Sequence, residues 1–229
     1  MQNSYLEASK DLHKQNPEYG KASEYLTPGT MKFALTIPDA ITASKKVQNI
    51  DSLLDYGTGQ GGLLQAIEAD RNITCKLFGY DPCISKYSKK PESKFDIVTS
   101  IDVLEHIGRD HIHQTLNEIS NITNQFFFFC IDLIPASKKI DDGRNAHFLL
   151  APADWWTQRI KEHFKIMTCI EVGELESGEA YPIHLFGCAS HSMNSFKAMN
   201  EFILHIRCAN KRWVWGKGAA RLIDYQETT

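Results

Sequence analysis

The sequence of 229 residues has no long apolar run. A membrane-spanning helix needs ~20 consecutive apolar residues, whereas the longest run here, around 126–131, has the length of a buried strand. Residues 1–7 lack the basic start and the apolar middle of a secretion signal. We therefore expect a cytoplasmic protein that does not attach to a membrane.

Excess positive charge and paired cysteines are absent as well. The formal net charge is −3, whereas proteins that bind nucleic acid usually carry a positive excess, because phosphate contacts supply most of their affinity. This balance disfavours nucleic acid as a partner without excluding a local basic patch. The six cysteines form no C-x-x-C pair, and no Cys/His spacing matches a zinc knuckle, so the sequence indicates no metal site.

From residue 52 onward, short apolar runs alternate with helical patterns, which predicts βαβ units and a parallel sheet. We expect strands at 52–56, 75–80, 95–100 and 125–132, and two paired strands near 165–172 and 183–189. Helices are expected over 38–46, 61–69, 110–121, 153–163 and 193–208, with a short helix or turn at 83–89. The predicted class is α/β in three parts: an N-terminal helical or lid segment, 1–48, a central domain, 49–190, and a C-terminal helix with a basic-aromatic tail, 191–229.

A glycine-rich turn joins the first expected strand to its helix, with the sequence Gly57, Thr58, Gly59, Gln60, Gly61, Gly62. Glycines let backbone N–H groups approach a ligand, and the N-terminus of the helix adds a favourable partial charge. Gly57, Gly59 and Gly62 fit the dinucleotide pattern G-x-G-x-x-G, while Gly57, Gly59 and Gly61 fit the G-x-G-x-G pattern of S-adenosyl-L-methionine (SAM) sites. By itself, the turn does not distinguish NAD from SAM.

Acidic residues end the first two strands. Asp55 faces the crevice at the carboxyl ends of the strands, where its carboxylate suits a cationic group, such as the amino end of SAM, better than a pyrophosphate. Asp81, followed by Pro82, is placed to accept hydrogen bonds from two vicinal ribose hydroxyls, which NAD and SAM both carry. The pair therefore favours an adenosine ligand, and Asp55 favours SAM.

The segment from Phe95 to Ile107 reads F-D-I-V-T-S-I-D-V-L-E-H-I. Together with the strand and glycine turn L-L-D-x-G-x-G-x-G and with Tyr80-Asp81, it resembles the class I SAM-dependent methyltransferases, within them the small-molecule group with a V-L-E-H segment. The resemblance is good over 51–135. It implies a Rossmann-like fold with a mostly parallel sheet, an antiparallel last strand and helices on both faces.

The resemblance also implies roles for particular residues. The glycine turn would wrap the methionine part of SAM, Asp81 would hold the ribose, and Ser100, Ile101 and Asp102 would lie beside the methionine and the methyl group. Glu105 and His106 match a Glu-His pair that shapes the site, although they could equally serve to fix a helix. The family usually fits a helix, a strand and another helix between Pro82 and Phe95, so we expect a sheet shortened after the second strand and no clear adenine-pocket residue.

A base is needed only if the methyl acceptor must lose a proton. His147 is the first candidate, because its polar loop follows the strand at 125–132 and should lie above the carboxyl edge of the sheet; His106 is the second. In the same loop, Arg144 and Asn145 are expected to bind substrate, Arg144 through its planar fork on an anionic group. Alternatively, these residues only organise the loop and His147 packs.

These features predict an enzyme that moves the SAM methyl group to O or N of a small-molecule acceptor. One alternative is nucleic-acid methylation guided by the tail, whose aromatic and basic side chains could stack on bases and contact phosphate. They are Lys211, Arg212, Trp213, Trp215, Lys217 and Arg221. The tail could instead pack on its own domain or at a homodimer contact. A NAD-dependent oxidoreductase is less favoured, because it would usually need a further substrate domain.

Overall fold

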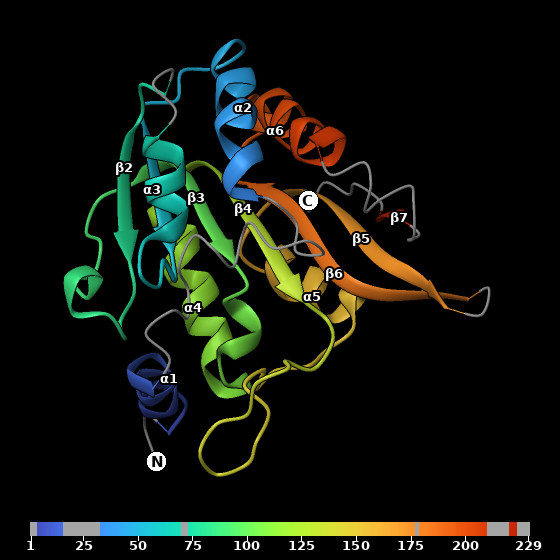
Figure 1. The fold of residues 1–229 in the computed structure, drawn as a ribbon. Helices are drawn as coiled ribbons and strands as arrows, with labels where there is room; N and C mark the ends of the chain where they lie inside the picture. The colour runs from blue at the N-terminus through green and yellow to red at the C-terminus, as the bar shows by residue number, and fades with distance from the viewer. Residues whose placement is uncertain (1–3, 16–32, 70–72, 177–178, 210–219, 224–229) are drawn as a thin grey trace.

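The computed structural model describes residues 4–15, 33–69, 73–176, 179–209 and 220–223. A seven-stranded sheet forms its centre, with the strand order β2-β1-β3-β4-β6-β5-β7 (Figure 1). The strands are β1 (Ser52–Tyr56), β2 (Lys76–Tyr80), β3 (Phe95–Ile101), β4 (Thr123–Asp132), β5 (Ile166–Glu176), β6 (Glu179–Ser190) and β7 (Ala220–Ile223). Each strand expected from the sequence is present, and β7 is an addition.

Strands β1 to β4 are mutually parallel where they pair, whereas β6 runs antiparallel to both β4 and β5. This confirms the predicted Rossmann-like class with a reversed strand near the end. The chain passes from β2 to β3 through a loop with one short 3-10 helix, Ser85–Tyr87, so β2 forms the edge of the sheet. The predicted shortening after the second strand is therefore confirmed.

The helices are α1 (Ser4–Gln15), α2 (Phe33–Lys45), α3 (Gly62–Glu68), α4 (Arg109–Ile122), α5 (Ala153–Lys161) and α6 (Phe196–Ala209). Helix α2 begins earlier than expected and continues through Pro38, which removes one backbone hydrogen bond. The apolar side chains of Ile37 and Ile41 are fully buried beside those of α6, and this burial offsets the cost of the proline. Helix α1 was not located by the sequence analysis.

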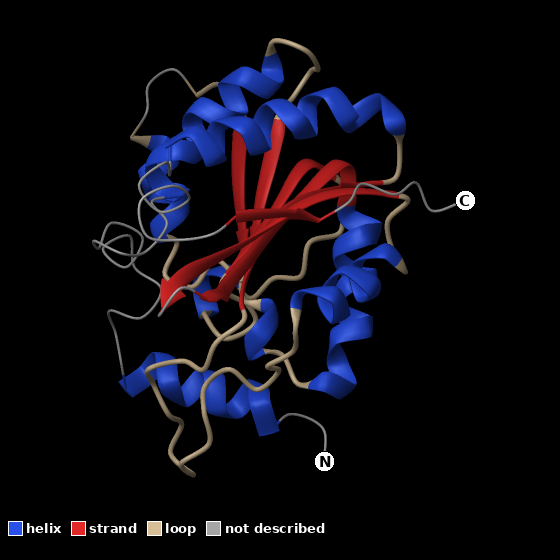
Figure 2. Cartoon of the chain, turned by 90° about the vertical axis from the view of Figure 1, so that its right-hand side faces the viewer, coloured by secondary structure: helices blue, strands red, loops and turns tan. Residues whose placement is uncertain are grey.

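Helices cover both faces of the sheet (Figure 2). The apolar core accordingly has two layers, one on each face. Four successive phenylalanines of β4 show why the strand is apolar throughout. Phe126 and Phe128 pack with α2, α3 and α6, while Phe127 and Phe129 pack with α4 and α5. Because neighbouring side chains of a strand point to opposite faces, a strand covered on both faces must be apolar at every position.

The division into segments at residues 48 and 190 stays a prediction, and α2 and α6 share one core layer with the sheet. Residues 16–32 of the expected lid segment lie outside the described residues, as does the tail from Lys211 to Lys217. The backbone of Arg221 pairs with Glu171 of β5, so this part of the tail extends the sheet. None of the described helices is long and apolar enough to cross a membrane.

Candidate active site

The glycine turn between β1 and α3 has a backbone that only glycine adopts easily. Gly57, Gly59 and Gly61 have φ angles of 85°, 52° and 80°. A Cβ on Gly57 would stand 2.5 Å from Cγ1 of Val103, and a Cβ on Gly61 would overlap the hydroxyl of Tyr87. The backbone at the turn is therefore pressed against its neighbours, and Val103 brings the segment after β3 into contact with it.

Asp81 lies at the end of β2 and is held by the backbone on both carboxylate oxygens. The N–H of Gly59 donates to Oδ2 at 2.9 Å, and the N–H of Cys83 donates to Oδ1 at 2.8 Å. Each oxygen keeps a further lone pair, because a carboxylate accepts about four hydrogen bonds. The carboxylate is thus oriented and still able to accept hydrogen bonds from two ribose hydroxyls.

Asp55, at the end of β1, is buried beneath the glycine turn, with 3% of its surface exposed. The hydroxyl of Thr99 donates to its Oδ1 at 2.8 Å. Burial, which disfavours the charged form, raises the pKa of Asp55 to about 6 despite this hydrogen bond. A cationic group bound at the turn would favour the ionised carboxylate.

The other predicted cofactor residues line the same edge. Thr58 and Ile101 are buried, Gln60 is half-buried and Pro82 is exposed. Ser100 is fully buried, and its hydroxyl has no hydrogen-bond partner within the described part of the chain. Asp102 has a φ of 53°, a conformation that is costly for any residue other than glycine and that is often found at functional sites. The glycine cradle and the oriented Asp81 fit SAM, and the individual contacts stay predictions.

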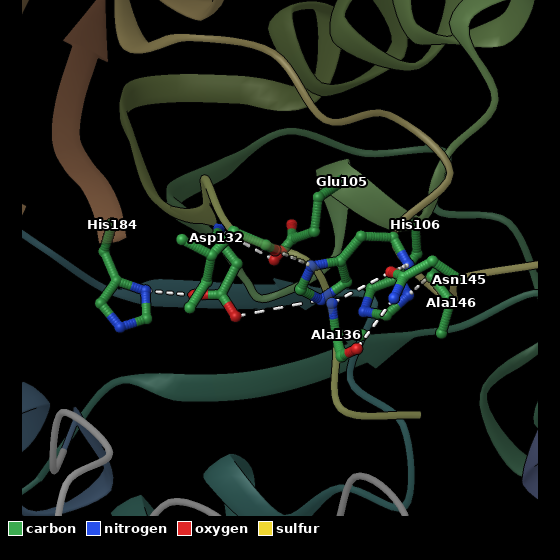
Figure 3. Close-up of polar contacts among 9 residues, drawn as sticks. Glu105, His106, Asp132, Ala136, Asn145, Ala146 and His184 are labelled. Atoms are coloured by element: carbon green, nitrogen blue, oxygen red, sulfur yellow. Dashed lines mark hydrogen bonds and ion pairs between the residues drawn. The ribbon is translucent and has the colours of Figure 1, made fainter. Parts of the chain in front are cut away.

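Beyond the ends of β3 and β4, acidic and histidine side chains form what we call the acid–histidine cluster, and Figure 3 labels Glu105, His106, Asp132 and His184 among them. Its members are Glu105, His106, Asp132, His147 and His184. The N–H of Asp132 donates to Oε1 of Glu105 at 3.0 Å, and Asp132 pairs with Nδ1 of His184 through Oδ1. Nε2 of His147 lies 3.9 Å from Oδ2 of Asp132. The cluster therefore joins the 3-10 helix Leu104–His106 after β3, strands β4 and β6, and the loop before α5.

Both predicted histidines are oriented by backbone carbonyls. Nδ1 of His147 lies 2.6 Å from the carbonyl oxygen of Ile134, and Nδ1 of His106 lies 2.8 Å from that of Ala146. A carbonyl can only accept, so in each ring the proton is assigned to Nδ1 and the lone pair to Nε2. The two rings meet edge to face with centroids 4.8 Å apart.

Charge in the cluster is strongly perturbed by burial. Burial, with the charges of Asp102 and Asp132 adding to it, raises the pKa of Glu105 well above its usual range. Burial, reinforced by His147, lowers the pKa of His106 to about 4, so this imidazole is neutral at physiological pH. Burial opposes the charged form of His184, yet the hydrogen bond to Asp132 and its charge raise the pKa of this histidine.

Arg144 and Asn145 make local contacts in the loop between β4 and α5. Nε and Nη2 of Arg144 each lie 2.7 Å from Oδ2 of Asp142, and both residues are exposed. The side chain of Asn145 accepts from the N–H groups of Ala136 and His147 and donates to the carbonyl of Ala136. These contacts organise the loop that carries His147, while substrate binding by either residue stays a prediction.

Sequence reasoning missed Asp132 and His184 of the cluster. Asp132 ends β4, so the rule that drew attention to Asp55 and Asp81 would have found it. His184 lies on β6, where only the antiparallel pairing that sets it opposite Asp132 reveals its place. Helix α1 was missed too. Its Gln15 donates to Asp141 at 2.8 Å, so α1 borders the same loop (Figure 1).

Comparison with known families identifies the chain. Residues 14–173 match a family described as methyltransferase domain, which is more than half of the sequence. The chain belongs to this methyltransferase family. Its cofactor is SAM, as the glycine turn and the segment from Phe95 to Ile107 predict, and the predicted enzyme class is confirmed. No curated protein matches the sequence.

Solved structures of methyltransferases share the fold. The magnesium protoporphyrin IX methyltransferase from Synechocystis PCC 6803, with bound SAM, superposes with a TM-score of 0.54 at 11% identity, covering 82% of this chain and 98% of that one. The plantazolicin methyltransferase in complex with S-adenosylhomocysteine gives a TM-score of 0.51 at 12% identity, covering 82% and 96%. At such identities the likeness establishes the architecture alone.

Proposed function

We propose that this methyltransferase acts on an O or N atom of a small-molecule acceptor, which binds at the carboxyl edge of the sheet beside the acid–histidine cluster. The observation that carries this proposal is the contact between Val103 and Gly57. Val103 directly precedes the 3-10 helix Leu104–His106, which carries Glu105 and His106, so the cluster begins next to the glycine turn. Polar groups at that place can orient an acceptor by hydrogen bonds.

SAM supplies a methyl group on a positively charged sulfur, and the lone pair of the acceptor atom takes this group while the carbon–sulfur bond breaks toward S-adenosylhomocysteine. The protein mainly contributes alignment and exclusion of water. Asp81 would fix the ribose end and Asp55 the amino end, so that the methyl group is held in one place. Leu104 and Ile107, both buried, anchor the segment that follows β3 in the core layer that also holds side chains of α4 and α5.

Two further facts support a small acceptor. Both solved structures named above are, by their names, methyltransferases for plantazolicin and for magnesium protoporphyrin IX, which are not nucleic acids. The net charge of −3 also gives the chain no overall attraction to a phosphate backbone. Cytoplasmic location agrees with these expectations and stays a prediction.

Transfer of labelled methyl from SAM into fractionated cell extract tests the proposal. The extract is divided into small molecules, protein and nucleic acid, and each fraction is incubated with the wild type or with Asp81→Ala, which should lose the cofactor. We expect label in the small-molecule fraction with the wild type alone. Label confined to the nucleic-acid or protein fraction would contradict the proposed acceptor class.

A further inference from the structure

The acid–histidine cluster contains the kinds of side chain that hold metal ions. Ligand atoms of Glu105, His106 and His147 lie within 4.8 Å of one another, and so do those of Asp102, Glu105 and Asp132. Glu105 is common to both groups. We propose that the cluster binds one divalent transition-metal ion, with Glu105, His106 and His147 as ligands and Asp132 completing the set.

The carboxylate of Glu105 provides the observation that favours a bound cation. Its side chain is fully buried, and Oε1 accepts the N–H of Asp132, but Oε2 has no hydrogen-bond partner among the residues that the structure describes. A buried carboxylate oxygen without a donor is costly, and the neighbouring Asp102 and Asp132 cannot donate to it while they are ionised. A metal ion at this oxygen would satisfy it and offset the repulsion among the three acids.

The two histidines are oriented as metal ligands usually are. A metal-bound imidazole commonly donates its other ring N–H to a backbone carbonyl, which fixes the tautomer and aims the free nitrogen. His147 makes this contact with Ile134 at 2.6 Å and His106 makes it with Ala146 at 2.8 Å, so a backbone carbonyl orients each ring through Nδ1. The hydrogen bonds of Asn145 hold the loop that carries His147.

The spacing of the set allows one ion to be shared. Bonds of about 2 Å from a metal ion to nitrogen and oxygen place neighbouring ligand atoms about 3 to 4 Å apart. Nε2 of His147 and Oδ2 of Asp132 are 3.9 Å apart, so this pair needs little movement. His184 stands behind Asp132 and pairs with its other oxygen, in the manner of an outer partner that orients a ligand.

The mixture of nitrogen and oxygen donors indicates the kind of ion. Two imidazoles with two carboxylates suit Zn²⁺, Co²⁺, Fe²⁺ or Mn²⁺, whereas Mg²⁺ prefers oxygen donors alone. The ion would lie next to the 3-10 helix that follows Val103, the residue in contact with Gly57. If the proposed function holds, the ion would bind an oxygen or nitrogen of the methyl acceptor. Only this role toward the acceptor rests on the proposed function.

The test uses the full chain, stripped with a chelator and titrated with Co²⁺ alone, without SAM or acceptor. Visible absorption of Co²⁺ reports its coordination, and Zn²⁺ and Mg²⁺ then compete for the site. We expect one Co²⁺ per chain, displaced by Zn²⁺ at far lower concentration than by Mg²⁺. Absence of Co²⁺ binding, or equal displacement by Mg²⁺, would overturn the proposal.

Variants locate the ion. Glu105→Gln and His147→Gln should each weaken Co²⁺ binding by at least about 10-fold, because loss of a ligand should cost no less than loss of an outer partner. His113→Ala is the matched control, since His113, Glu162 and His163 form a second group with the same 4.8 Å spacing on the surface. This control should bind as the wild type does.

Circular dichroism shows first that each variant is folded. If Glu105→Gln does not fold, His147→Gln on the loop decides. Wild-type affinity in folded ligand variants, or loss of the ion in His113→Ala, would refute the assignment. Because no step of the assay involves methyl transfer, a failed metal site leaves the proposed acceptor class standing, and a failed acceptor class leaves the metal result intact.

Discussion

A substitution in the glycine turn gives the sharpest prediction, because its cost has two separable parts, one from the left-handed backbone and one from steric overlap. Replacing Gly57 by alanine places a non-glycine residue at a φ of 85° and sets its Cβ 2.5 Å from Cγ1 of Val103. The left-handed backbone costs about 1–2 kcal/mol, and overpacking against a neighbour costs about 1–3 kcal/mol. We therefore expect Gly57→Ala to lower the free energy of unfolding by about 2–5 kcal/mol.

Gly143 is the matched control for the backbone part. Its φ is also 85°, but a Cβ there would have no atom within 4 Å. Gly143→Ala should therefore cost only the backbone part, about 1–2 kcal/mol. The difference between the two variants measures the overlap with Val103.

Val103→Ala tests the steric part from the other side. It removes both Cγ atoms and leaves Cβ, which is 3.0 Å from the added methyl. In the double variant, Gly57→Ala should thus cost about 1–3 kcal/mol less than it does alone. The free energies of unfolding come from urea denaturation without cofactor, and calorimetry with S-adenosylhomocysteine measures the effect on the site.

The reasoning would be refuted in either of two ways. Gly57→Ala could prove no more destabilising than Gly143→Ala, or its effect could be additive with that of Val103→Ala. Either result would mean that the turn and the segment after β3 are not in contact in solution. The link between the cofactor cradle and the acid–histidine cluster would then lose its support.

The remaining predictions concern the cofactor, pH and the loop. SAM and S-adenosylhomocysteine, at 100 times their dissociation constant, should stabilise the protein by about 2.7 kcal/mol and so raise its melting temperature. NAD and NADP should leave the melting temperature unchanged, and Asp81→Ala should abolish the rise that SAM causes. Because Asp55 has a pKa of about 6, its carboxylate becomes protonated as pH falls below 6, so SAM affinity should fall about tenfold between pH 7 and 5; a wild-type profile in Asp55→Asn would exclude this cause. The raised pKa of Asp55 also links folding to pH, because the folded protein binds this proton more tightly than the unfolded chain does. The resulting stabilisation is complete below the unfolded pKa of 3.8 and is lost as pH rises through 6. Urea denaturation at pH 7 should therefore find Asp55→Asn more stable than the wild type. Asn145→Ala should destabilise by about 1–3 kcal/mol in the same assay, because it leaves the backbone of Ala136 unpaired, and a neutral result would show that water replaces these bonds.

The sequence could be read furthest where local pattern and fold agree. Strand β1 begins and ends at the predicted residues, and β4 could be placed because a strand covered on both faces is apolar throughout. Helix α2 could not be bounded, since Pro38 argues against a helix interior and only burial against α6 overrides it. The strand β7 depends on pairing with β5, to which no local signal points.

For the site, the sequence determined the cofactor, whereas the tertiary structure determined which side chains lie in contact with one another. Glycines, strand-ending acids and the V-L-E-H segment lie within short stretches whose geometry is local, so their spacing alone indicates a SAM cradle. Glu105, Asp132 and His184 come from three separate parts of the chain, and the antiparallel register that sets Asp132 against His184 is a property of the whole sheet. Burial of Glu105, which leaves one of its oxygens without a donor within the described part of the chain, likewise arises only when β4 and the loop before α5 meet it, through Asp132 and Leu149. The metal site that we propose therefore belongs to the folded chain, while the methyltransferase could already be recognised in its sequence.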